Sequence, residues 1–270
     1  MPISESQKKA AAIGDDLRAR AGSAQLASEG KRRALIFIVA SPRPQVGKTF
    51  LARLLVDFLR LDGGRATVFD LNPNGDALTD YFPDLATACD LGDIKGQMAL
   101  FDSLVVDSGV GKVVDVGTGS FERFFAIVQE IRFIEEATRR SMEPVILFIA
   151  DAHRVAIKAY ADLRRRFPTA ILVPVFNEAT MKARNLRDQF PFERDTVPLQ
   201  IPILEQALKE QVEKSSCSFA DLHERPPMRI PSALAFELRA WTRRTFLQFR
   251  ELELRLLLER LRASLMGGAP

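Results

Sequence analysis

The segment from Ala34 to Leu61 constrains the fold more than any other part of the chain. Its first seven residues, ALIFIVA, form a continuous apolar run with β-branched residues, which predicts a strand buried on both faces of a parallel sheet. The helical spacing of apolar residues in TFLARLLVDFLRL at 49–61 predicts a helix, which the Gly63-Gly64 pair would end. A buried strand, a short loop and an amphipathic helix in this order are typical of α/β sheets.

The same alternation continues along the chain. Strand patterns recur at 65–71, 112–117, 144–151 and 170–179, helical patterns at 121–140 and 153–167, and a strand end with a helix at 201–214. We therefore predict a doubly wound α/β domain with a mostly parallel sheet over residues 32–222. In such sheets ligands bind beyond the carboxyl ends of the strands. Four candidate site residues fall at or just after such ends: Lys48, Asp70, Asp115 and Asn177.

The two ends of the chain have a different character. Residues 1–31 are rich in Ala, Ser and Lys, and predict a frayed helix or a disordered arm. A proline-rich connector at 223–231 leads to a Leu- and Arg-rich helix over about 232–266, either continuous or broken once. We expect residues 223–270 to form a C-terminal helical extension.

Composition narrows the class of protein. Hydrophobic residues make up 47% of the 270 and charged residues 27%, which is ordinary for a globular protein. The sequence shows neither an apolar run near the roughly 20 residues that span a bilayer nor a secretory signal, so we expect a cytoplasmic location. Two cysteines and two histidines are too few for a disulfide framework or a zinc cluster. With a net charge of +3, any binding of nucleic acid would depend on local clustering of charge.

The loop after the first strand has the residues of a phosphate-binding site. Such a site needs backbone N–H groups at a helix N-terminus, a lysine for the phosphates and a hydroxyl for Mg²⁺. The predicted nucleotide-binding residues here are Val46, Gly47, Lys48, Thr49 and Phe50. Pro42 and Pro44 have no N–H, and Pro42 stands where the strict phosphate-loop pattern has its first glycine.

Several motifs together resemble a known family. RPQVGKT at 43–49, VFDLNPNGDALTDYF at 68–82, KVVDVGTGSFERF at 112–124 and VPVFNEA at 173–179 resemble, in order and spacing, the deviant-Walker ATPases of the ParA and MinD type. These belong to the SIMIBI class of P-loop NTPases. The resemblance covers about 33–205 and implies a P-loop NTPase-like fold that binds ATP and Mg²⁺.

The resemblance also implies roles for single residues. Asp70 matches the acid that orients the attacking water, and it would lie near the metal; Asp115 matches the magnesium-side carboxylate, which acts with Thr49. Asn177 matches an asparagine that contacts adenine. Arg43 stands in place of the signature lysine, which reaches across a dimer to the partner's phosphates. Lys48 and Arg43 would stabilise the transferring phosphoryl group. Purely structural roles, as turn caps or an exposed loop residue, remain open for the two acids, Asn177 and Arg43.

The family's function would be an ATP-dependent homodimer that positions or partitions DNA, a plasmid or a protein assembly with an unidentified protein partner. Hydrolysis would be slow, or ATP would be bound without appreciable hydrolysis, because of the prolines and missing glycines in the loop. Two alternatives remain. One is a degenerate scaffold that binds nucleotide weakly or not at all and acts through its C-terminal helix. The other is a small-molecule enzyme that resembles dethiobiotin synthetase, whose loop also ends in V-G-K-T.

The C-terminal helix carries an apolar stripe and many arginines. The stripe predicts packing on the domain or on a partner helix, and consists of Leu238, Trp241, Phe249, Leu252 and Leu256. The arginines are Arg239, Arg243, Arg244, Arg250, Arg255, Arg260 and Arg262. They admit three interpretations: non-specific DNA binding and nucleoid association, an amphipathic membrane contact at 256–268, or a solvated face offset by Glu237, Glu251, Glu253 and Glu259.

Overall fold

The computed structural model describes residues 34–61, 64–72, 77–106, 108–181, 186–192, 197–214, 218–220 and 231–267. The predicted arm at 1–31 lies outside these residues, as do the boundary expected at 222–223 and all but the last residue of the connector at 223–231. Cys217 and His223 also lie outside them.

Within the described residues the strands form one sheet in which every neighbouring pair is parallel. The seven strands are β1 (Ala34–Ala40), β2 (Ala66–Asp70), β3 (Ala86–Ala88), β4 (Gly111–Asp115), β5 (Met142–Ile149), β6 (Ile171–Asn177) and β7 (Leu199–Ile201). Their order across the sheet is β3-β2-β4-β1-β5-β6-β7. This confirms the predicted doubly wound α/β fold. Strand order reverses around β1, so the crevice that binds ligands in such folds lies beyond its carboxyl end.

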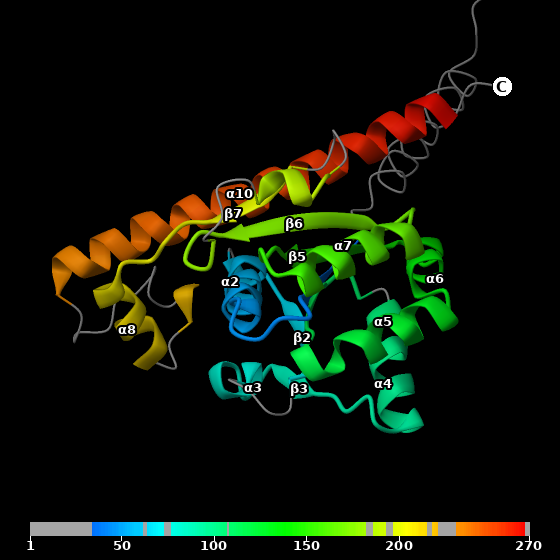
Figure 1. Ribbon diagram of the computed structural model, residues 1–270, viewed down its shortest axis with the longest axis horizontal. Coiled ribbons are helices and arrows are strands. Elements are labelled where there is room, and N and C mark those ends of the chain that lie inside the picture. Colours follow the sequence, from blue (N-terminus) through cyan, green and yellow to red (C-terminus); the bar gives the residue numbers. More distant parts are fainter. Residues whose placement is uncertain are drawn as a thin grey trace, which may run out of the picture. The chain divides into compact units, whose positions relative to one another are not determined.

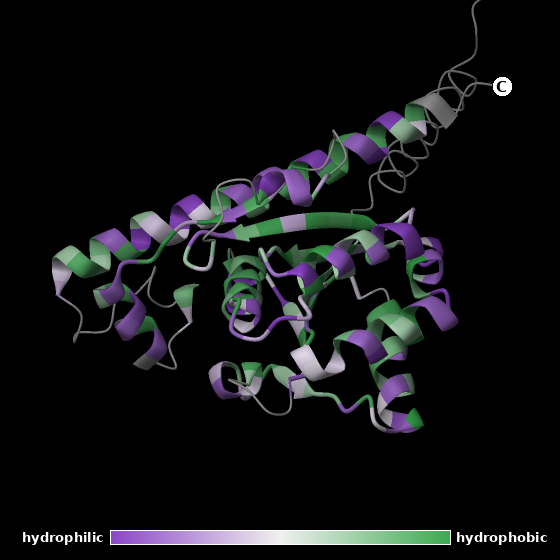
Figure 2. Ribbon diagram, viewed as in Figure 1, coloured by the Kyte–Doolittle hydropathy of each residue, from purple (hydrophilic) through white to green (hydrophobic). Residues whose placement is uncertain are grey.

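Helices cover both faces of the sheet (Figure 1). They are α2 (Lys48–Arg60), α3 (Leu78–Tyr81), α4 (Ile94–Val105), α5 (Phe121–Glu130), α6 (Phe133–Arg139), α7 (Arg154–Arg166), α8 (Gln206–Lys214) and α10 (Ser232–Gly267), with short 3-10 turns at Thr118–Ser120 and Arg187–Gln189. Alternate residues of β1 face the two layers: Ile36 and Ile38 pack with α4 to α7, whereas Phe37 and Val39 pack with α2, α3, α8 and α10. Figure 2 shows β6 as mainly apolar, in agreement with its burial in the sheet.

The C-terminal helix is continuous over Ser232–Gly267, so the break that the sequence allowed does not occur. Its predicted apolar stripe is buried against the domain itself, on the same layer as α2. Phe58 of α2 contacts the rings of Phe246 and Phe249 at 5.7 and 5.4 Å between centroids. The helix α2, which begins where the loop after β1 ends, therefore packs directly against the C-terminal helix.

Two parts of the fold differ from the sequence-based prediction. The single helix expected over 121–140 is two, α5 and α6, because Arg132 takes a left-handed conformation with φ of 49° and ends the first helix. This turn places Phe133 and Ile134 in the core. The elements α3, β3 and α4 were not predicted; β3 has only three residues, too few for a periodic pattern.

Candidate functional site

The loop between β1 and α2 has the backbone geometry of an anion-binding nest. Gln45 and Gly47 have positive φ values of 56° and 96°, and Val46 between them does not. Alternation of this kind turns successive N–H groups toward one concave side. The loop leads into the first turn of α2, whose N–H groups have no acceptor inside the helix. These N–H groups and the positive end of the helix dipole favour a bound anion.

The two prolines shorten this set of donors. Pro42 and Pro44 have no N–H, and the N–H of Arg43 between them donates to Ser41 Oγ at 3.3 Å. The donors that remain for an anion therefore begin at Gln45. This is the part of the loop that the sequence-based prediction assigned to the site.

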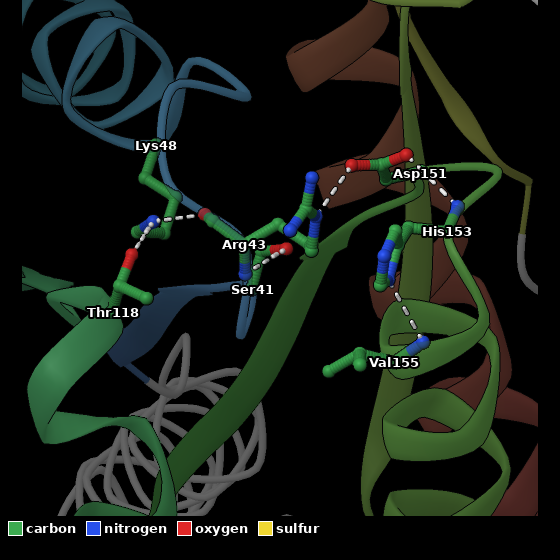
Figure 3. Close-up of polar contacts among 7 residues, drawn as sticks. All are labelled: Ser41, Arg43, Lys48, Thr118, Asp151, His153 and Val155. Carbon is green, nitrogen blue, oxygen red and sulfur yellow. Dashed lines mark hydrogen bonds and ion pairs between the residues drawn. The ribbon is translucent and has the colours of Figure 1, made fainter.

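Lys48, the first residue of α2, is enclosed by the loop (Figure 3). Its Nζ donates to the carbonyl oxygen of Arg43 at 2.7 Å and to Thr118 Oγ1 at 2.9 Å. The residue is only 8% exposed, and burial lowers its pKa while the charge of Asp115 acts in the opposite direction. The ammonium group is thus a largely buried cation at the loop, bonded to the Arg43 carbonyl and to Thr118.

Thr49, which follows Lys48, and Asp115 form a hydrogen-bonded pair of oxygen groups. Thr49 Oγ1 donates to Asp115 Oδ2 at 2.6 Å, and among the described atoms the other carboxylate oxygen of Asp115 has no hydrogen-bond partner although it is buried. The pKa of Asp115 is raised to about 7, mainly by burial and to a smaller extent by the charge of Asp70, against the lowering effects of the Thr49 bond and Lys48. Hydroxyl and carboxylate oxygens are ligands that Mg²⁺ prefers, and a buried carboxylate oxygen without a partner suits a cation. These residues therefore fit the metal that the sequence predicts.

Asp70 lies beside Asp115, since β2 and β4 pair in register at these two residues. Its carboxylate accepts hydrogen bonds from the N–H groups of Asn72 at 2.9 Å, Leu78 at 2.6 Å and Thr79 at 3.4 Å. In this structure Asp70 holds the turn after β2 and the start of α3. Its role toward water or metal stays a prediction.

Arg43 is paired within its own chain (Figure 3). Its Nε donates to Asp151 Oδ2 at 3.2 Å, and the two side chains are 35% and 23% exposed. The other oxygen of Asp151 accepts the N–H of His153 at 3.0 Å, and His153 Nδ1 accepts the N–H of Val155 as the cap of α7. Arg43 is thereby tied to the loop that follows β5.

Of the remaining predicted residues, Val46 and Phe50 direct their side chains into the core, and Asn177 bonds to the backbone of the loop. The ring of Phe50 contacts Phe219 and Trp241 at 5.6 and 5.8 Å, and Val46 is buried in the core. Asn177 Nδ2 donates to the carbonyl oxygen of Val46 at 2.9 Å. Only backbone groups of Val46 and Phe50 can therefore serve an anion at the loop in this conformation.

The prediction missed two residues that the fold brings to the loop, Thr118 and Asp151. Each follows the end of a strand next to β1: Thr118 lies beyond β4, and Asp151 beyond β5. The rule that ligands bind at the carboxyl ends of the strands would have pointed to both.

No protein-family model and no curated protein matches the chain. Among solved structures, a similar chain comes from the MinC:MinD cell division protein complex of Aquifex aeolicus, with 15% sequence identity and a TM-score of 0.49 over 78% of this chain and 94% of that one. The parallel doubly wound sheet and the lysine-bearing loop at the start of α2 define a P-loop NTPase-like α/β fold. Among the described residues, none of the helices combines the length and the apolar character that crossing a bilayer demands.

Proposed function

We propose that this protein is an ATP-binding switch of the ParA/MinD type, which dimerises with ATP and Mg²⁺ and positions or partitions a cellular cargo. The observation that carries the proposal is the combination of Lys48 with the Thr49–Asp115 pair at the mouth of an N–H nest. These are the three groups that a triphosphate with Mg²⁺ requires: donors, a cation and hard oxygen ligands.

In this proposal each residue of the site has a separate role in binding or hydrolysing the nucleotide. The N–H groups from Gly47 to Phe50 hold phosphate oxygens, and Lys48 exchanges its contacts with Arg43 and Thr118 for a phosphate. Thr49 and Asp115 hold the metal, which when bound neutralises charge on the phosphates. Asp70 orients a water, and slow hydrolysis is expected because its oxygens also accept the N–H groups of Asn72, Leu78 and Thr79.

Calorimetry with ATP in the presence of Mg²⁺ tests the proposal on the wild-type protein. Light scattering of the same samples tests the dimer: binding should be accompanied by a change from monomer mass to dimer mass, and Asp70→Ala should prolong the dimer by slowing hydrolysis. Binding without any change in mass would contradict the switch.

A gel shift on arbitrary duplex DNA, with and without ATP, tests whether the helix α10 binds DNA when the protein is loaded with ATP.

A second candidate is a scaffold that acts through α10 with little or no nucleotide binding. Exposed leucines on this helix favour it: Leu247, Leu254, Leu258, Leu261 and Leu265. Three arginines of the helix already pair with its own glutamates, at Arg250–Glu253, Arg255–Glu251 and Arg262–Glu259, which favours the solvated-face interpretation over DNA at those positions. No heat of ATP binding to the wild type would support the scaffold.

Removal of the Thr49 hydroxyl should uncouple nucleotide binding from Mg²⁺. Thr49→Val keeps the shape of the side chain but removes the donor to Asp115 and one metal ligand. We expect the affinity for ATP with Mg²⁺ to fall about tenfold, to the value measured without metal. Calorimetry with Mg²⁺ or EDTA measures this, and Thr138→Val on α6 is the matched control, since that hydroxyl bonds only to Ile134 O. A variant with undiminished Mg²⁺ dependence would count against the metal site.

If Arg43 acts on the partner's phosphates, it must first leave Asp151. Asp151→Asn should therefore strengthen ATP-dependent dimerisation, by about fivefold at most for each of the two Arg43 residues of a dimer, because a partly exposed ion pair is worth no more than about 1 kcal/mol. Arg43→Ala should abolish the dimer but keep ATP binding to the monomer. Light scattering against protein concentration measures both, with Asp162→Asn, which breaks the exposed pair with Arg165, as the control. Equal dimerisation by wild type and Asp151→Asn would show that Asp151 does not compete with the partner's phosphates for Arg43.

A further inference from the structure

Asn177, the last residue of β6, is bonded across the fold to the phosphate loop. It is 9% exposed, and both polar atoms of its amide are engaged. Nδ2 donates to the carbonyl oxygen of Val46 at 2.9 Å, and Oδ1 accepts the N–H of Ala179 at 3.1 Å. These two bonds fix the orientation of the amide, and because the residue is only 9% exposed, little of its second N–H and second oxygen lone pair is presented to a base.

The bond to Val46 sets the direction of the next N–H group. In a trans peptide the C=O of one residue and the N–H of the following residue point in opposite directions. Since the Val46 carbonyl points to Asn177, the Gly47 N–H points away from it. The two residues also pack closely, because a Cβ at Gly47 would lie 2.6 Å from Asn177 Nδ2 and Gly47 has φ of 96°. A side chain at residue 47 would strain the backbone and displace the amide.

We propose that Asn177 is a positioning residue for the phosphate loop: it holds the Val46–Gly47 peptide so that the Gly47 N–H faces the bound phosphates, and it does not read the nucleobase. The proposal rests on the proposed function in one respect, that the loop binds a polyphosphate. It replaces the adenine contact that the sequence predicted for this residue. The base would then be selected by other groups or not at all.

The two roles differ in their dependence on the base. Asn177→Ala should lower the affinity for ATP with Mg²⁺ and for inorganic tripolyphosphate with Mg²⁺ by the same factor, about tenfold for the loss of one buried hydrogen bond. In the ligand-free protein the same variant should speed amide hydrogen exchange in the peptide that covers residues 41–50, and should leave exchange in β1 and β5 unchanged. Asn177→Ser, which keeps a hydroxyl donor, is the second variant if the alanine variant does not fold.

Glu178→Ala is the matched control, because Glu178 is the next residue and accepts the Ile203 N–H at 3.3 Å rather than a loop group. Lower affinity for ATP with unchanged affinity for tripolyphosphate would overturn the proposal in favour of base recognition. Unchanged exchange at 41–50 in ligand-free Asn177→Ala would overturn it independently of any ligand. If wild type binds neither polyphosphate but exchange at 41–50 rises in the variant, the positioning role stands and the proposed function fails.

Discussion

Lys48→Met should abolish measurable binding of ATP with Mg²⁺ and leave the ligand-free protein at least as stable as the wild type. The expected loss of affinity is at least about 100-fold, since a charge-assisted bond to phosphate is worth about 3 kcal/mol in a desolvated site. The stability of the ligand-free protein, in contrast, should stay the same or increase. Burial lowers the pKa of Lys48, so its charged form is held at a cost in the folded protein, and methionine fills similar space without charge.

A loss of ATP affinity without a loss of stability distinguishes a lysine that binds phosphate from one that holds the fold together. Calorimetry measures the affinity, and thermal unfolding without ligand measures the stability. Lys158→Met, on an exposed face of α7, removes the same charge elsewhere and should change neither quantity. If Lys48→Met unfolds at a much lower temperature than the wild type, the contacts to Arg43 O and Thr118 would be the purpose of this lysine, and its role at a phosphate would lose its support.

Asp57→Asn should stabilise the protein near neutral pH and have little effect in acid. Asp57 is buried on α2 and accepts the N–H of Phe219. Burial raises its pKa from 3.8 to about 6, against the lowering effects of the Phe219 N–H, Arg60, Arg53 and Ser218. The folded protein therefore binds the proton more tightly than the unfolded chain. The stability that this group contributes is full below pH 3.8 and is lost as the pH rises through 6.

Each pH unit by which this pKa exceeds its ordinary value corresponds to about 1.4 kcal/mol, so the loss by pH 7 is about 3 kcal/mol. Asparagine does not titrate and can still accept the Phe219 N–H, so the variant's advantage should grow from about pH 4 and level off above about pH 6. Urea unfolding from pH 4 to 8 measures this difference. Asp102→Asn, exposed on α4, is the control. A difference that does not change with pH would refute the assignment.

The Asp57 contact also links the site to the C-terminal part of the fold. The residues around Phe219 are held against α2 by Asp57, and the rings of Phe219, Phe50 and Trp241 lie together. Phe50 is two residues after Lys48. A substitution that loosens this cluster should therefore also disturb the first turn of α2, next to the nest.

The sequence by itself determined the parts of this protein that depend on local pattern. The run ALIFIVA, the amphipathic helix after it and the Gly47-Lys48-Thr49 turn fix a strand, a loop and a helix, because each segment's burial is encoded in its own periodicity. Asp115 beside Thr49 was also predictable, since the carboxyl ends of parallel strands meet at one edge. The break at Arg132 was not, because a left-handed residue leaves the helical periodicity on either side of it intact.

Only the tertiary structure decided which groups surround the loop. The pairing of Arg43 with Asp151, of Lys48 with Thr118 and of Val46 with Asn177 joins residues far apart in the chain. Their neighbourhood follows from the order β4-β1-β5-β6 in the sheet. Strand order is set by packing between segments far apart in the chain and cannot be inferred from any single segment. The sequence could therefore assign Asn177 to the site but could not predict its bond to the loop.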